Sequence, residues 1–131
     1  LGARRMNTTT YVFASCFLME MQRMHAHALQ AAEFFHGPFE VVDEATPLLL
    51  LIGEDPSRPI AERVLEFTKQ YSQNTIVYDS KEFPMSGITP EIHPLVAPMI
   101  VVAALTNLVE TIALLRDHPM TTRRYMGKVV Y

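Results

Sequence analysis

A glutamate and a histidine are the two side chains in this sequence whose types and surroundings suit them to moving protons. Glu20 lies among apolar residues in the segment Phe17–Gln22, and burial there would make its carboxylate a usable base. His36 follows two aromatic residues and precedes Gly37-Pro38. A histidine can donate or accept a proton near neutral pH. The pair predicts acid–base chemistry, with a base on one helix and an acid at the end of the next.

The segment Glu33–Glu40 must position His36. Two aromatic residues are expected to anchor it to the core, and Pro38 ends the preceding helix because proline lacks an amide donor and restricts the residue before it. Glu33 lies one helical turn earlier and either orients the imidazole or is a solvated charge. His36 can alternatively be a structural residue stabilised by the helix dipole, and Glu20 a carboxylate on the helix surface.

The C-terminal residues 119–131 form a basic tail that is a third candidate. Arg123 and Arg124 can face a phosphate or a neighbouring acidic group, and the sequence does not choose between them. The alternative is a frayed terminus, which is the default for any tail.

Composition narrows the class of protein. A chain of 131 residues predicts one domain, and 49% hydrophobic residues can supply a real core. The net charge of −3 gives no reason to expect a nucleic-acid partner. The single cysteine, Cys16, excludes an intrachain disulfide and fits a reducing cytoplasm, and no signal peptide is visible.

Hydrophobic patterning predicts a layered α/β fold with a parallel sheet. The apolar run Leu48–Ile52 is typical of a strand buried on both faces, Thr75–Tyr78 predicts a second strand, and Pro90–His93 a possible third. We expect helices from about Thr10 to Met24, over Ala28–Phe35, from Arg58 to Tyr71 with Ser57 as the cap, and from the end of the possible third strand to about Arg116.

The stretch Leu95–Leu115 is long enough to span a bilayer and contains one charged residue, Glu110. It also contains Pro98 and several polar residues. We therefore interpret it as a helix buried on most sides, against a sheet and a partner subunit, and expect no membrane partner.

The first ten residues indicate that this sequence is a fragment of a longer protein. Leu1-Gly2 is typical of the end of a strand, and no methionine begins the chain. Thr8, Thr9 or Thr10 can cap the following helix, and the arginines and threonines of this loop can contact an anion at the helix N-terminus.

Three segments carry a family resemblance: LMEMQ, EFFHGPFE and HPMTTRRYMGKVVY, in this order. They resemble the second half of sugar isomerase (SIS) domain proteins, most closely the fructosamine 6-phosphate deglycases. More distantly they resemble the isomerase domain of glutamine–fructose-6-phosphate aminotransferase. The resemblance runs from Tyr11 onward. It implies a flavodoxin-like, SIS-type parallel sheet that lacks its first strand, with residues 1–131 as a second SIS domain and residues 119–131 as its tail.

The resemblance also implies roles for individual residues. Glu20 matches the general base that moves a proton at the sugar carbons, and His36 matches the acid of ring opening or amine departure. Lys128 matches a tail lysine that closes over the open-chain sugar. The main phosphate-binding residues of the family lie in its first half, so none is assigned to this chain.

The function that this resemblance implies is cleavage of a fructose-amino acid 6-phosphate by water, giving glucose 6-phosphate and the amino acid. It implies no metal or organic cofactor, and a homodimer or larger oligomer in which His36 reaches a neighbouring subunit's site. Two alternatives stay open. One is a ketose–aldose isomerase or aminotransferase on the same fold, and the other is a non-catalytic sugar-phosphate-binding or assembly module.

Overall fold

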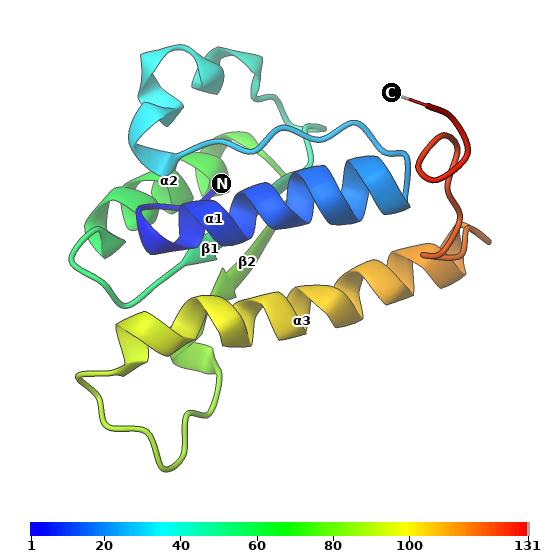
Figure 1. Ribbon diagram of the computed structural model, residues 1–131. Coiled ribbons are helices and arrows are strands. Elements are labelled where there is room, and N and C mark those ends of the chain that lie inside the picture. The colour runs from blue at the N-terminus through cyan, green and yellow to red at the C-terminus, as the bar shows by residue number, and fades with distance from the viewer. Residues whose placement is uncertain (131) are drawn as a thin grey trace.

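A computed structural model describes residues 1–130 and shows a parallel sheet at the centre of an α/β fold. Strands β1 (Leu48–Ile52) and β2 (Thr75–Asp79) pair in parallel, and helix α2 (Arg58–Tyr71) connects them (Figure 1). The predictions for these three elements are confirmed almost to the residue. Gly2 forms parallel bridges to Leu51 on one side and Gln30 on the other, so Leu1-Gly2 behaves as the end of a strand, as predicted.

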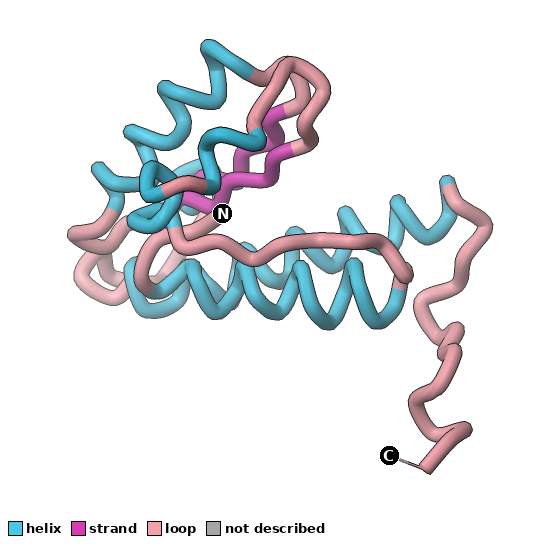
Figure 2. The backbone as a smooth tube through the Cα atoms, turned by 90° about the horizontal axis from the view of Figure 1, so that it is seen from above, coloured by secondary structure: helices cyan, strands magenta, loops and turns pink. Residues whose placement is uncertain are grey.

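Helices cover both faces of this sheet, and β1 contributes to the two cores alternately because successive side chains of a strand point to opposite faces. Leu50 and Ile52 pack towards α2 together with Ala61 and Val64. Leu49 and Leu51 pack towards the opposite layer, which consists of α1 (Arg5–Tyr11), its continuation η1 (Val12–Met21) and α3 (His93–Leu115). Figure 2 shows the long helices of this layer side by side.

The first helix differs from the prediction in its start, its end and its type. It begins at Arg5, so the threonines lie inside it: the Thr10 hydroxyl donates to the Met6 carbonyl at 2.9 Å. From Val12 to Met21 it is a π-helix, whose wider turn closes with the Gln22 amide donating to the Phe17 carbonyl at 3.1 Å. The residues of η1 that contact α3 therefore do not recur with the 3.6-residue period of an α-helix.

The predicted helix over Ala28–Phe35 is wrong in its first half. Ala31 donates its amide to the Gly2 carbonyl at 2.8 Å, and Gly2 donates to Leu29 at 3.2 Å, so the sheet takes the hydrogen bonds a helix would need. A short 3₁₀ helix, η2 (Ala31–His36), follows.

The corner after η2 is built as the sequence predicts. Gly37 has φ of 134°, outside the range of a helix, and Pro38 starts a second short 3₁₀ helix, η3 (Pro38–Val41). The aromatic anchor is confirmed: Phe34 is buried, and its ring lies 5.5 Å from Phe67 of α2. His36 is thus held at a rigid turn.

One prediction about the last third of the chain is wrong, and a second, the burial of α3 by a sheet and a partner subunit, is tested only for the part that lies within this chain. Residues 90–92 form a turn that leads into α3, with the Ile92 amide donating to Thr89, and no strand forms there. The helix α3 has the length and mean hydropathy of a membrane span, 23 residues and 1.9, but only one of its faces is buried. Its outer face leaves Met99 72% and Leu114 83% exposed, so within this chain α3 is not covered on most sides.

The loop after β1 is organised by Asp55 rather than by the predicted cap Ser57. The Asp55 carboxylate accepts the amide and hydroxyl of Ser57, whose own side chain makes no capping hydrogen bond. Burial opposes ionisation of Asp55, but these hydrogen bonds, the Arg5 amide and the charge of Arg4 lower its pKa below the ordinary value. A carboxylate of the chain itself, that of Asp55, therefore lies at the N-terminus of α1.

An ion pair at the end of β2 gives a first prediction. Arg58 donates to both Asp79 oxygens, at 2.9 Å for Nη1–Oδ1, and both side chains are 17% exposed. Burial alone would raise the pKa of Asp79, but the Arg58 hydrogen bonds outweigh it and the pKa is lowered from 3.8. We expect Asp79→Asn to lower the free energy of unfolding at pH 7 by about 2–3 kcal/mol.

The pH dependence of this loss has a definite sign. A depressed carboxyl pKa contributes stability above the unfolded pKa of 3.8, and that stability disappears as pH falls through the folded pKa. Denaturant unfolding of the Asp79→Asn variant and the wild type should therefore converge below about pH 4. A difference that stays constant from pH 7 to pH 3 would show that the ion pair is not its source.

Candidate functional site

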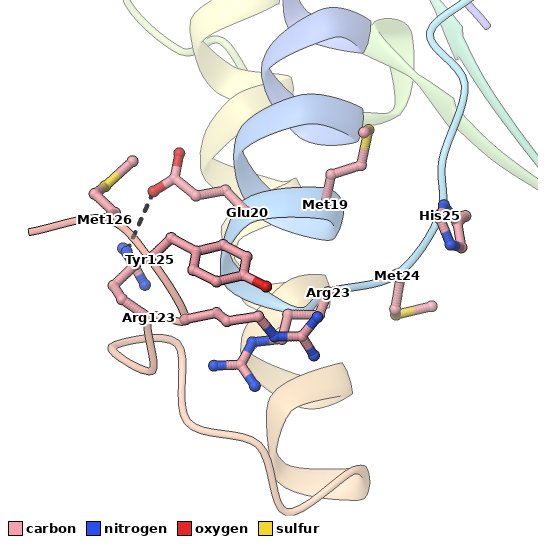
Figure 3. A pocket seen from close by; sticks show the side chains of 9 residues that line it. Met19, Glu20, Arg23, Met24, His25, Arg123, Tyr125 and Met126 are labelled. Carbon is pink, nitrogen blue, oxygen red and sulfur yellow. Dashed lines mark ion pairs between the residues drawn. The ribbon is translucent and has the colours of Figure 1, made fainter. Parts of the chain in front are cut away.

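A cavity of about 350 Å³ opens between the C-terminal end of η1 and the tail (Figure 3). One wall comes from the end of η1 and the turn after it, and the other from four consecutive tail residues. The lining residues are Met19, Glu20, Arg23, Met24, His25, Arg123, Arg124, Tyr125 and Met126. Two of the three segments that carry the family motifs therefore meet at one cavity.

Glu20 lies in this cavity and is paired. Its Oε1 atom is 3.3 Å from Nε of Arg123, with the two side chains 30% and 24% exposed (Figure 3). Nη1 of Arg123 donates to the Met120 carbonyl at 2.6 Å and to the Thr122 carbonyl at 3.2 Å, which fixes the guanidinium. Of the two tail arginines, Arg123 is thus the one that faces an acidic group, and it supplies the counter-charge for an ionised Glu20.

Gln22 holds the two walls together, and sequence reasoning missed it. The side chain is fully buried, and its Nε2 donates to the His118 carbonyl at 3.0 Å. The Gln22 carbonyl accepts Nη1 of Arg116 at 2.6 Å. The end of η1 is therefore fastened to the end of α3, where the tail begins. The signal available in the sequence was a polar amide directly after an apolar helix.

The remaining tail candidates lie at the edge of the site. The Arg124 guanidinium lies 6.0 Å from the centre of the Tyr125 ring, and both residues line the cavity. Lys128 is exposed and does not line it; its Nζ donates to the Arg123 carbonyl at 2.6 Å. In this conformation Lys128 forms a hydrogen bond within the tail and does not face Glu20.

His36 and Glu33 lie elsewhere in the chain. Both are exposed on η2, and within residues 1–130 neither forms an ion pair or a side-chain hydrogen bond. The segment containing η2 and η3 lies at one end of the molecule and the C-terminal end of η1 at the other, in both Figure 1 and Figure 2. One copy of the chain therefore brings Glu20 together with Arg123 and Arg124, and does not bring it to His36.

Comparison with known proteins agrees with the motifs. Fructosamine deglycase FrlB of Bacillus subtilis is 40% identical over 121 residues, which are 92% of this chain and 37% of that protein. Fructoselysine 6-phosphate deglycase of Escherichia coli K12 is 36% identical over 113 residues, 86% of this chain and 32% of that protein. No family model matches the chain.

The fold comparison points the same way. A crystal structure assigned to the phosphosugar isomerases, from Bacillus subtilis, has a TM-score of 0.96 and 38% sequence identity. It matches 99% of this chain, which covers 40% of that structure. The chain shares the fold of this phosphosugar isomerase neighbour and is similar in sequence to part of proteins named as fructosamine deglycase and fructoselysine 6-phosphate deglycase. It spans well under half of the length of these relatives.

Proposed function

We propose that residues 1–131 are the second SIS domain, with residues 119–131 as its tail, of a deglycase that acts on fructose-amine 6-phosphates. The products would be glucose 6-phosphate and the free amine. The observation that carries the proposal is the placement of Glu20 in a cavity closed by the tail, in a chain whose relatives include proteins named as fructosamine and fructoselysine 6-phosphate deglycases.

The reaction needs a base beside the sugar and an acid at the amine. Glu20 removes a proton from C1, next to the C2 carbonyl, and the electron pair forms an enaminol. Return of a proton to C2 gives an imine between C1 and the nitrogen. Water adds to C1, and the C1–N bond breaks as the nitrogen receives a proton, for which we propose His36 as the donor. Substrate plus water thus equals glucose 6-phosphate plus amine.

The tail and η2 supply the proposed binding groups. Arg123 holds Glu20 in place and can release it towards substrate, and Arg124 offers a second guanidinium in the same cavity. Lys128 would reach the sugar hydroxyls after leaving the Arg123 carbonyl, and Glu33 would contact substrate next to His36.

A second copy of the chain is part of this proposal. His36 is exposed at the end of the molecule away from Glu20, so it would complete the site of a neighbouring subunit. The outer face of α3, with Leu95 and Met99 exposed, offers apolar surface that an oligomer would bury.

The test uses the purified full-length protein and two substrates that differ only in the amine. We expect glucose 6-phosphate from fructosamine 6-phosphates, measured with a coupled dehydrogenase assay, and none from fructose 6-phosphate. Glucose 6-phosphate formed equally from fructose 6-phosphate would instead support the isomerase alternative, in line with the phosphosugar isomerase neighbour. No turnover of either, with sugar phosphate still raising Tm, would support a binding module.

A further inference from the structure

We propose that Arg23, together with Arg124, binds the carboxylate of the amino acid that the substrate carries. The inference rests on the proposed function and goes beyond it, because it assigns a specificity determinant to a residue that the family motifs do not include. It predicts that this protein prefers amino-acid adducts of fructose 6-phosphate over adducts of simple amines.

The charges lining the cavity leave two cations without a counter-ion. Among the lining residues that the structure describes, Glu20 carries the only carboxylate, and it is paired with Arg123. Within residues 1–130, Arg23 and Arg124 form neither an ion pair nor a side-chain hydrogen bond, although both guanidiniums belong to the same cavity. A pair of guanidiniums is suited to a planar carboxylate, which each can bind through two parallel hydrogen bonds.

The backbone at Arg23 is held in an unusual conformation that aims the residue at this cavity. Its φ is 53°, in the left-handed region that non-glycine residues seldom adopt. Arg23 directly follows Gln22, the C-cap of η1, and the Met24 amide donates back to the Leu18 carbonyl at 2.9 Å, so this conformation closes the end of the helix beside the cavity.

The position of Arg23 suits the amine part of the substrate rather than the sugar. In Figure 3, Tyr125 separates Glu20 from Arg23, so an anion bound by Arg23 would lie away from the carbons that react at Glu20. The cavity walls include the side chains of Met19 and Met24, and Met126 lies on the Glu20 side. Such apolar, adaptable walls fit the aliphatic part of an amino acid better than a sugar phosphate covered with hydroxyls.

The test compares substrates that differ by one carboxylate: fructosylglycine 6-phosphate against fructosylmethylamine 6-phosphate, and fructoselysine 6-phosphate against its cadaverine counterpart. In the full-length protein, Arg23→Asn is the main variant because asparagine tolerates the left-handed backbone. We expect it to raise KM for the carboxylate-bearing substrates by about 10- to 100-fold, with kcat nearly unchanged. KM for the simple amines should stay the same.

Controls separate this site from a general effect of charge. Arg124→Ala should reproduce the selective loss, Arg23→Lys should restore part of the affinity, and Lys69→Ala on the exposed face of α2 should change nothing. Equal KM increases for both members of a pair would overturn the inference and point to phosphate binding. No change for either member would also overturn it. If the wild type splits none of the four compounds, both the proposed function and this inference are wrong.

Discussion

Replacing Glu20 by glutamine is expected to lower kcat of the full-length protein on fructosamine 6-phosphates by about 10²–10⁴-fold, the contribution typical of a general base. Glutamine keeps the shape of the side chain and can still contact Arg123, but it cannot accept the C1 proton. KM should change little, because the substitution leaves the cavity walls in place and glutamine can still contact Arg123. Initial rates of glucose 6-phosphate formation measure the effect.

A matched carboxylate provides the control for this variant. Glu66→Gln removes the same charge from α2, where the side chain is 75% exposed and pairs with Lys69. It should leave kcat unchanged, and both variants should unfold within a few degrees of the wild type. Turnover by the Glu20→Gln variant within tenfold of the wild type would remove Glu20 from the mechanism.

Replacing His36 by asparagine is expected to produce a loss of similar size, and mixing the two defective proteins is expected to restore activity. In the proposed mechanism the acid and the base of a site come from different copies, because η2 and the end of η1 lie at opposite ends of one chain. In a mixed oligomer of Glu20→Gln and His36→Asn chains, one site combines two intact residues and another combines two defective ones.

The measurement is kcat after the two variants are denatured together, refolded and separated as hetero-oligomers by different affinity tags. Each variant refolded alone serves as the control for activity regained by refolding itself. Recovery in the mixed sample only would support an active site shared between subunits. A mixed sample as inactive as its components would contradict the shared site. His36 would then act with Glu20 of its own chain, or would not act with Glu20 at all.

The parts of the fold that the sequence predicted are those in which local pattern and tertiary packing agree. Leu48–Ile52 is a continuous apolar run and is buried on both faces, and the amphipathic pattern of Arg58–Tyr71 matches the face that packs on β1. The prediction of a helix over Ala28–Phe35 was wrong in its first half, because Leu29 and Ala31 form their backbone hydrogen bonds with Gly2, which is far away in the sequence. Helical propensity does not reveal such a partner.

The candidate site, like the fold, was predictable from the sequence only in part. Glu20 became a candidate through the family resemblance, and the two tail arginines through their charge; the structure adds that Arg123 is the one that pairs with Glu20. The contacts of Gln22 were not predictable, because they join the end of η1 to residues 94 and 96 positions later, at the end of α3. The largely apolar sequence of α3 likewise did not show which of its faces packs within the chain and which is left exposed.

The most direct test of the account is a crystal structure of the full-length protein with a non-reacting analogue of a fructosamine 6-phosphate bound. We expect C1 of the analogue to lie within hydrogen-bonding range of the Glu20 carboxylate in the cavity beside Arg123, with the His36 imidazole of a second copy near the amine nitrogen. An analogue bound away from this cavity, with Glu20 still contacting only Arg123 and solvent, would contradict it.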